Sequence, residues 1–416
     1  MSNEILLTNA RKSPKLAPAT AVGAMIKKLT LTNFKNFRKA EVHFGPFSIL
    51  VGANASGKSN IRDALRFLHG VGRGYNLAEI IGGKWGEGGQ PEWSGIRGGT
   101  REICFSGEEE FKLEVEYVMN EVSAFPFRYE ITVQCGLHGG SPQMRKEGIY
   151  YDKPPIPPVW EMKDYDGFPM QPQLTFSPGV APVDDLKLGS IRFIDLDPES
   201  MRRPSVPGQL ILGDRGDNLS SVLQAICEKP ELKQALSHWI QELTPMDVVG
   251  FKFVPDAEGK ILVYLVEEGG RKTSAKSASD GTLRFLGMLA ALLGPKPARF
   301  YFLEEIDTGI HPTRLALLMD LIASTTRNRG IQVVATTHSP QVLRLIRRED
   351  LENAALVYRV KGTSEGRVKQ LPDIPHLMDV IKNQDIARLH ESSWMEDAME
   401  FTEGKPQPFP LEEERK

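Results

Sequence analysis

The chain has 416 residues, of which 40% are hydrophobic and 25% are charged, and its formal net charge is -3. This composition is ordinary for a globular protein, and the length suits one large α/β domain with an inserted subdomain, or two domains. The net charge excludes a global positive field, so DNA binding would need local patches. No apolar run reaches the length that crosses a bilayer, so no membrane partner is expected. Three widely separated cysteines form no metal or redox pattern, which fits a reduced, cytoplasmic setting.

The first part of the chain divides into a leader and two strands. Residues 1–24 are polar, rich in proline and alanine, and without periodicity, so we expect a flexible leader. Met25 is an alternative start of the protein. Residues 26–34 and 40–44 alternate between apolar and polar side chains, which predicts an antiparallel pair of strands.

Residues 52–59 match the phosphate-binding loop pattern G-x-x-x-x-G-K-[ST] at every fixed position. An apolar run at 47–51 predicts a buried strand before the loop, and residues 60–68 are apolar at helical spacing. A strand, a glycine-bearing loop and a helix aim backbone N–H groups and a positive helix end at a phosphate chain. The segment therefore predicts a nucleotide site, and the two preceding strands are expected to cover the base side.

The residues of this loop have separate roles. Gly52 and Gly57 let the backbone approach the anion without a Cβ in the way. Lys58 is expected to reach the β- and γ-phosphates, and the Ser59 hydroxyl to hold Mg²⁺. Two asparagines complete the nucleotide-binding set of this segment: Asn54 and Asn60.

The middle of the chain predicts an insertion of about residues 100–190. Residues 70–99 are glycine-rich and predict a long loop. Three β-type runs separated by turn residues follow, at 101–106, 111–119 and 127–134, and they predict an antiparallel β subdomain. Residues 153–182 carry many prolines and predict an irregular connection.

A strand at 191–198 carries a D-x-D pair, Asp195 and Asp197. Such a pair could bind a metal in a nuclease, but no other acidic cluster is nearby and Pro198 stops the strand. We therefore interpret it as a strand end with a capping aspartate. Further along, the pattern predicts helices at 218–235 and 236–243 and a hairpin of 251–254 with 261–266.

Ser279 and Gly281 stand two residues apart, immediately before an apolar helix at 285–293. A serine at a helix N-terminus accepts backbone hydrogen bonds, and the positive end of the helix favours an anion. The S-x-G segment therefore predicts a second anion-binding cap in the same chain.

Glu304 and Glu305 follow a buried strand at 300–303. Ligands bind at the carboxyl ends of strands in open parallel sheets. One carboxylate can hold Mg²⁺, directly or through water, and the other can orient and polarise an attacking water. The next apolar strand, at 331–336, leads into Thr-His-Ser-Pro, where His338 can contact a γ-phosphate or the water; alone, it would be interpreted as structural.

The phosphate loop, the S-x-G segment, the paired carboxylates and the T-H-S-P segment occur in this order. Together they resemble the ABC-type ATPase heads of the SMC and RecF families. The segment Leu-Thr-Leu-Thr-Asn-Phe-Lys-Asn-Phe at 29–37 and the Gly-Ile-His-Pro turn at 309–312 are similar to the predicted AAA-type ATPases that share the head of OLD-family proteins. The resemblance covers roughly residues 25–345, with the motifs concentrated at its two ends.

The resemblance implies an α/β fold: a P-loop NTPase head of the ABC type with the inserted antiparallel β subdomain. It implies ATP and Mg²⁺ as cofactors, with Lys58 and Ser59 as phosphate and metal ligands, and Glu304 beside Ser59 at the metal. By the same resemblance, Glu305 is the catalytic carboxylate and His338 the switch histidine. Ser279 and Gly281 would contact the γ-phosphate of a partner's ATP, in a homodimer with ATP at the interface or a higher oligomer.

Three departures from the family pattern concern the rate of hydrolysis more than nucleotide binding. The first carboxylate is Glu304, where the family usually has aspartate, and Ile306 stands where proline is common. The glutamine that usually follows the first helix has no clear counterpart except Gln90. No long heptad region separates the two halves, so a long-armed SMC protein is excluded.

Residues 346–416 predict a small C-terminal α+β extension with strands at 355–360 and 367–371 and a disordered end from about 403. The extension is too short and too poor in carboxylate pairs for the TOPRIM nuclease that OLD-family proteins carry there. Basic clusters at 202–203 and 344–348 could touch phosphates, although solvated faces and ion pairs explain them better.

Two functions from different classes are consistent with these observations. The first is an ATPase that drives or gates a separate effector, plausibly a nuclease or toxin, in phage defence or DNA maintenance. The second is a nucleotide-gated DNA clamp or scaffold that holds ATP with little turnover. A transporter subunit fits poorly because of the inserted β subdomain.

Overall fold

The computed structural model describes residues 24–118, 126–135, 140–151, 160–163, 172, 188–241 and 248–403. The expected leader, the expected disordered end and most of the expected irregular connection lie outside these residues. The described chain forms two compact units, one from residues 196–297 and 309–331 and a larger one from the remaining segments. No helix in the described ranges combines the length and apolarity needed to cross a membrane.

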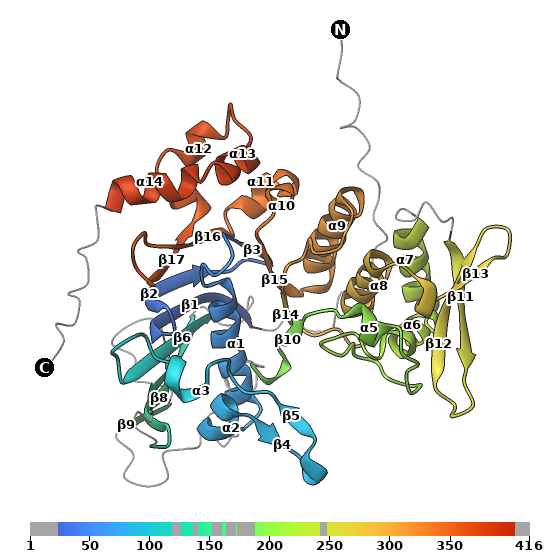
Figure 1. Ribbon diagram of the computed structural model, residues 1–416, viewed down its shortest axis with the longest axis horizontal. Helices are drawn as coiled ribbons and strands as arrows, with labels where there is room; N and C mark the ends of the chain where they lie inside the picture. Colours follow the sequence, from blue (N-terminus) through green and yellow to red (C-terminus); the bar gives the residue numbers. More distant parts are fainter. Residues whose placement is uncertain are drawn as a thin grey trace, which may run out of the picture. The chain divides into compact units, whose positions relative to one another are not determined.

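The larger unit contains a mostly parallel sheet. Its strands, in spatial order, are β10 (Arg192–Ile194), β14 (Phe300–Leu303), β15 (Gln332–Thr337), β3 (Phe47–Val51), β16 (Ala354–Arg359) and β17 (Gly366–Gln370). All neighbours are parallel except β16 and β17. β3, from the start of the chain, lies between β15 and β16 from its end (Figure 1). β3, β14 and β15 are buried along their whole lengths, as their apolar runs predict.

The second sheet of this unit is antiparallel. Its strands, in spatial order, are β2 (Phe37–His43), β1 (Met25–Phe34), β6 (Glu110–Val118), β7 (Phe127–Gln134), β8 (Gln143–Tyr151) and β9 (Trp160–Lys163). The predicted inserted strands therefore extend the sheet that β1 and β2 begin. The alternating burial of β6 reflects one face on the core and one face in water.

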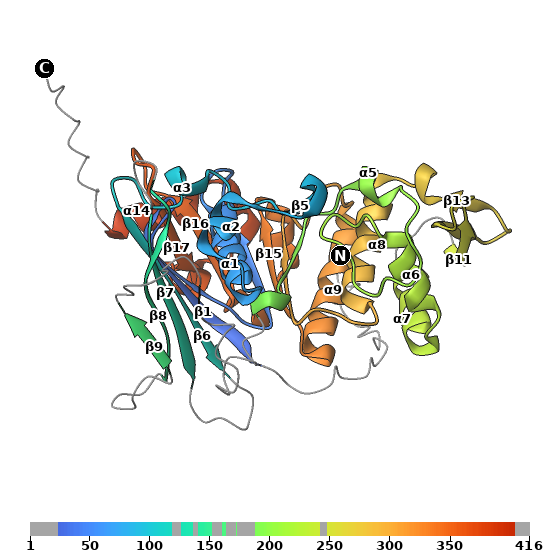
Figure 2. The ribbon, with the colours of Figure 1, turned by 90° about the horizontal axis from the view of Figure 1, so that it is seen from below.

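Helix α1 (Lys58–Gly72) lies between the two sheets (Figure 2). Its apolar side chains, Ile61, Leu65 and Leu68 among them, are fully buried. They share one hydrophobic core with residues of both sheets, such as Phe111 and Phe302. This packing fixes the start of α1 against the strands that surround it.

The structure corrects the expectation of a long loop over residues 70–99. This stretch contains α2 (Leu77–Gly82), β4 (Lys84–Trp85), a 3-10 turn (Glu87–Gly89) and β5 (Pro91–Trp93). Asn76 and Glu79 form a capping box that starts α2. The expected strand at 101–106 is also wrong, because α3 (Gly99–Glu102) occupies its start.

The C-terminal part of the larger unit confirms the two predicted strands as β16 and β17 and adds short helices. These are α10 (Pro340–Leu345), α11 (Arg348–Leu351), α12 (Leu377–Val380), α13 (Ile386–Glu391) and α14 (Trp394–Glu403), with a 3-10 turn at Leu371–Asp373. Arg344 pairs with Asp385 and Glu391, so ion pairing accounts for that part of the basic cluster.

The smaller unit is mainly helical. It contains α5 (Pro198–Met201), α6 (Leu219–Cys227), α7 (Pro230–Gln241), α8 (Asp280–Leu293) and α9 (Pro312–Arg329), together with β11 (Val248–Pro255), β12 (Ile261–Glu267) and β13 (Lys272–Ser274). The predicted hairpin is confirmed as β11 and β12. Asp197 accepts hydrogen bonds from the Glu199 and Ser200 amides at the start of α5, which confirms its capping role.

The cysteines correct a third expectation. Cys104 and Cys135 form a disulfide across 31 residues of sequence, although their spacing suggested no redox pattern. Cys135 directly follows β7, and its amide donates to the carbonyl of Glu109 just before β6. Cys104 forms a β-bridge with Phe34 at the end of β1, and β6 lies between β1 and β7, so this part of the sheet brings the two thiols together, which spacing along the chain does not reveal.

Candidate functional site

The phosphate loop, the paired carboxylates and His338 meet at one edge of the parallel sheet. The loop follows β3, Glu304 and Glu305 follow β14, and His338 follows β15. These three strands are adjacent and parallel, in the order β14, β15, β3. Their carboxyl ends therefore face the same side of the sheet, where open α/β sheets bind ligands.

The phosphate loop needs its two glycines. A Cβ on Gly52 would lie 2.0 Å from the carbonyl oxygen of Val357 on β16. Gly57 has a φ of 123°, which side chains rarely adopt, and it precedes α1 without any side-chain cap. The first turn of α1 carries no acidic residue. The helix start therefore presents an uncompensated positive end to the loop.

The Lys58 side chain folds back onto the backbone of the loop. Its Nζ donates to the carbonyl oxygens of Gly52 at 2.6 Å and Ala53 at 2.8 Å. Burial lowers the pKa of Lys58, while the charges of Glu305 and Asp307 oppose this shift. The ammonium thus has carbonyl partners that a phosphate can replace, and it lies within the field of the carboxylates after β14.

The two carboxylates differ in environment. Glu305 is exposed, has a φ of 45°, and donates its amide to Thr336 Oγ1 on β15 at 3.0 Å. Its Oε2 accepts a hydrogen bond from Thr308 at 3.0 Å. Glu304 is partly buried, and its Oε2 lies 3.2 Å from Nε of Arg62 on α1. A positive φ at a non-glycine residue is uncommon and marks a backbone held by its surroundings.

His338 is exposed just beyond the last residue of β15. The preceding Thr337 is fully buried and donates from Oγ1 to Asp307 at 2.6 Å. This hydrogen bond joins the segment after β14 to the end of β15. The turn that carries His338 is therefore tied directly to the segment that carries the two glutamates.

Two supporting contacts were missed by sequence reasoning. Asn36, in the turn between β1 and β2, donates to Ser56 O at 3.2 Å and accepts from Asn60 at 2.7 Å. Asp63 on α1 is buried and pairs with Lys35 at 3.1 Å and Arg97 at 3.2 Å. The Asn-Phe-Lys-Asn-Phe segment was noted in the sequence, but only the fold shows that its polar residues hold the phosphate loop and α1.

The loop also fits a ligand that brings hydrogen-bonding groups. Ser56 is 3% exposed, and its Oγ has no hydrogen-bond partner among the described residues. Ser59 and Asn60 are half-buried at the start of α1, beside the uncapped amides, while Asn54 is exposed. Together with Lys58 and Glu304, these groups have the donor and acceptor types that bind a nucleotide with Mg²⁺.

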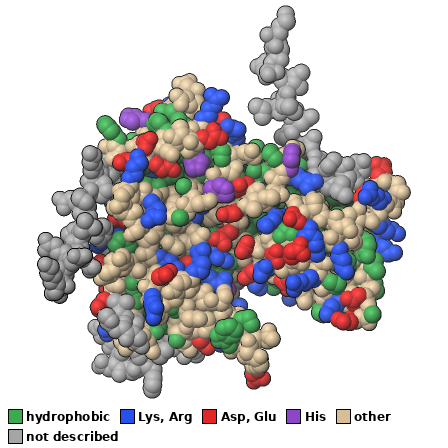
Figure 3. All heavy atoms as spheres, in the orientation of Figure 1, with side chains coloured by type: hydrophobic (Ala, Val, Ile, Leu, Met, Phe, Trp, Pro, Cys, Tyr) green, Lys and Arg blue, Asp and Glu red, His purple; other side chains and the backbone are tan. Residues whose placement is uncertain are grey.

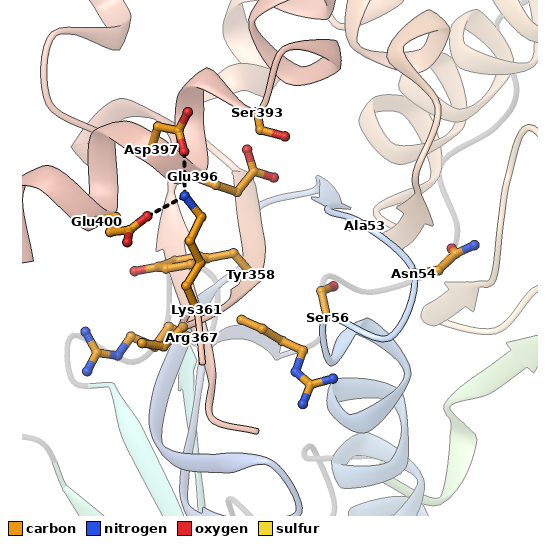
Figure 4. A pocket seen from close by; sticks show the side chains of 12 residues that line it. Ala53, Asn54, Ser56, Tyr358, Lys361, Arg367, Ser393, Glu396, Asp397 and Glu400 are labelled. Carbon is orange, nitrogen blue, oxygen red and sulfur yellow. Dashed lines mark hydrogen bonds and ion pairs between the residues drawn. The ribbon is translucent and has the colours of Figure 1, made fainter. Parts of the chain in front are cut away.

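A cavity of about 310 Å³ lies beside the phosphate loop. It is lined by Asn54 and Ser56 on one side and by residues of β16, β17 and α14 on the other (Figure 4). Within it, Lys361 points at Asp397 and Glu400 and pairs with both, at 3.1 and 2.6 Å. These ion pairs attach α14 to the segment that follows β16.

The other predicted site residues belong to the smaller unit or to the β4–β5 hairpin. Ser279 is the N-cap of α8, and its Oγ accepts from the Thr282 amide at 3.2 Å. Gly281 lies in the first turn of that helix, beside Gly309. Gln90 is exposed in the hairpin turn, where its carbonyl accepts from Gly86.

Comparison with known proteins agrees with this arrangement. Residues 25–121 match a family described as an AAA ATPase domain. Residues 179–344 match an AAA domain family whose description names the AbiEii toxin and a Type IV TA system. Two segments of the chain thus match AAA domain families, and the fold is that of a P-loop NTPase head of the SMC type.

The proteins similar to this chain are distant relatives. A protein of Helicobacter pylori named "ATP/GTP phosphatase" is 21% identical over 383 residues, which cover 81% of this chain and 92% of that protein. A solved SMC head bound to the C-winged helix domain of ScpA is 16% identical, with a TM-score of 0.51, and covers 83% of this chain and 97% of its own. The SMC head domain from Thermotoga maritima has 15% identity, a TM-score of 0.45 and coverages of 83% and 98%.

Proposed function

We propose that this SMC-like head binds ATP with Mg²⁺ and hydrolyses it to ADP and phosphate, and that the ATP cycle drives or gates a separate effector. The observation that carries the proposal is the meeting of Lys58, Glu305 and His338 at the carboxyl ends of three adjacent parallel strands. A lysine in an uncapped glycine loop binds phosphates, and a nearby carboxylate orients a nucleophilic water.

Each residue has a role in this proposal. Lys58 exchanges its two carbonyl partners for the β- and γ-phosphates. Glu305, held by Thr336 and exposed, orients the attacking water, and His338 hydrogen-bonds the γ-phosphate or that water. Ser59 and Glu304 would hold Mg²⁺, and the metal would supply positive charge beside the transferred phosphate.

The proposed assembly is a homodimer that closes around ATP. The phosphate loop serves the nucleotide of its own chain, so the S-x-G segment at the start of α8 is available for the γ-phosphate held by a second copy. A two-fold interface then completes each site in trans. ATP favours this closed dimer, hydrolysis loosens it, and higher oligomers can be built from it.

The effector in this proposal is a nuclease or toxin in phage defence or DNA maintenance. Two findings support a separate partner: one matching family description names a toxin of a Type IV TA system, and one similar SMC head was solved with a bound ScpA domain. We place the protein in the cytoplasm, where ATP and DNA are available, with no role for a membrane.

A second candidate, a nucleotide-gated DNA clamp or scaffold with little turnover, has one observation in its favour. Glu304, expected at the metal, has its Oε2 engaged by Arg62, which leaves one carboxylate oxygen for the metal. On the face drawn in Figure 3, basic and acidic side chains are interspersed rather than separated by sign. Since the net charge of the chain is -3, DNA binding by this chain alone should be weak and fall steeply with salt.

Turnover separates the two candidates. The expected result is steady phosphate release by the wild type, none by Lys58→Ala, and ATP binding without release by Glu305→Gln, with the Glu305→Gln protein accumulating as a dimer in light scattering. A wild type that binds ATP yet releases no more phosphate than Glu305→Gln would favour the clamp.

Mixing two inactive variants tests the shared site. Ser279→Arg keeps its own phosphate loop but blocks the trans contact, and Lys58→Ala keeps Ser279. A mixed dimer has one complete site, so the mixture should recover part of the wild-type turnover. If the folded variants associate and stay inactive, the trans site is wrong.

A further inference from the structure

Arg62 and Glu304 form a partly buried ion pair inside the candidate site. The Nε of Arg62 lies 3.2 Å from Oε2 of Glu304 in an ion pair that lacks hydrogen-bond geometry, and the two side chains are only 16% and 19% exposed. The guanidinium carbon also lies 5.9 Å from the centre of the Phe193 ring on β10. A pair this sheltered is less screened by water than an ordinary surface pair.

The location of Arg62 connects the pair to the phosphate loop. Arg62 follows Lys58 by four residues and Ser59 by three, so it lies one turn further along the same face of α1. Its side chain spans from this helix to the carboxyl end of β14. Arg62 therefore joins the helix with the expected phosphate ligands to the strand that ends at the carboxylates.

The contact engages one oxygen of the carboxylate. Oε2 of Glu304 faces Arg62, and in the described residues Oε1 has no hydrogen bond or ion pair. A carboxylate has two oxygens, and Mg²⁺ sites in proteins use one or two carboxylates together with waters. Oε1 is thus available for the metal or for a water bound to it.

We infer that Arg62 is a positioning residue, which fixes Glu304 through Oε2 and so presents Oε1 to Mg²⁺. The inference rests on the proposed function, because it takes Glu304 as a metal ligand. It also explains why position 304 has glutamate where the resembled family usually has aspartate. Glutamate is one methylene longer than aspartate, and the extra length lets one side chain contact Arg62 and still reach the metal. Partners that orient a ligating carboxylate typically affect metal affinity by about 10- to 100-fold.

The test uses electron paramagnetic resonance to measure Mn²⁺ binding to the full chain in the presence of ADP. Calorimetry measures ADP binding without metal. Arg62→Leu should weaken Mn²⁺ binding by about 10-fold and leave metal-free ADP binding unchanged. Arg62→Lys should recover part of the loss. Glu304→Asp should weaken Mn²⁺ binding as well, and adding Arg62→Leu to it should produce no further loss, because the contact is already broken.

Arg66→Leu is the matched control, since it removes an arginine one turn further along α1 that contacts Ser94 and the Trp93 ring instead. It should leave Mn²⁺ binding unchanged. If Glu304→Gln weakens Mn²⁺ binding but Arg62→Leu leaves it unchanged or strengthens it, the positioning role is wrong and the proposed function stands. If Glu304→Gln has no effect, Glu304 is not a ligand, and the metal assignment and the inference are both wrong.

Discussion

The two helix starts that the sequence assigns to phosphate are built differently. α1 begins after Gly57 with no side-chain cap and no acid in its first turn. α8 begins with Ser279, whose hydroxyl caps the Thr282 amide, and with Asp280, which pairs with Arg202 at 2.5 Å. The first amides of α1 have no side-chain cap from their own chain and can take an anion, whereas one amide of α8 is already capped by Ser279. The difference is what we expect of a resident nucleotide site and of a contact made only when a partner supplies the phosphate.

The acidic residues near the two helix starts differ as well. Asp63 on α1 is buried between Lys35, Arg97 and the core, and Arg97 also donates to Ser59 O at 2.8 Å. Asp280 on α8 has a side chain that is 64% exposed. The phosphate-loop helix is thus anchored by a buried Asp63–Lys35 pair, to which the more exposed Arg97 adds, while the α8 start is held by a pair whose carboxylate is solvent-screened.

The largest effect is expected from breaking the buried network. Asp63→Ala leaves the Lys35 ammonium, whose side chain is 8% exposed, without its carboxylate. We expect it to lower the free energy of unfolding by about 3 to 5 kcal/mol in urea titrations. Asp280→Ala is the control in the other region, with an expected loss below about 1 kcal/mol. Equal losses would contradict the comparison.

The next effect concerns nucleotide affinity. Lys58→Ala removes the ammonium that we expect to face the phosphates, and truncating one partner of a buried charge contact corresponds to a loss of about 100-fold or more in affinity. Calorimetric titration with ATP measures it. Ser279→Ala removes only the cap of α8 and should leave ATP binding by the single chain unchanged. If Lys58→Ala binds ATP as tightly as the wild type does, the assignment of this loop as the nucleotide site is wrong.

The smallest expected effect is a change with pH in the free energy of unfolding, which comes from one histidine of α1. His69 on this helix is buried beside the Trp93 and Phe193 rings, and burial lowers its pKa to about 4. An unfolded histidine titrates near pH 6.5, so the unfolded chain binds the proton first as the pH falls. The stability contributed by neutral His69 is therefore complete above about pH 6.5 and is lost as the pH falls toward 4.

Between pH 7 and pH 5 this one group should lower the free energy of unfolding by about 2 kcal/mol. The measurement compares urea titrations at the two pH values. His69→Phe should remove that part of the dependence, although it also loses the 2.9 Å contact between Nδ1 and Leu188 O. His43, exposed on β2, provides the control, because His43→Gln should retain the full slope. An unchanged slope in His69→Phe would show that another group titrates.

The sequence by itself determined the parts whose signal is local. The phosphate loop is a contiguous pattern, so its strand, its glycines and its helix were predictable from neighbouring residues. The buried strands β14 and β15 were predictable from short apolar runs, and each ends at the residues assigned to chemistry. The cap at Ser279 follows from the same local rules.

The tertiary structure alone decided which distant segments meet. The placement of β15 between β14 and β3 brings Glu305 and His338 to the phosphate loop, and no spacing along the chain encodes that strand order. The Cys104–Cys135 disulfide, the Asp63 network and the Arg62–Glu304 pair depend on it in the same way. Local patterns reflect backbone preferences and periodic burial. These contacts instead join residues whose separation along the chain ranges from 28 to more than 240 positions. They form only when the two sheets and α1 pack into one core.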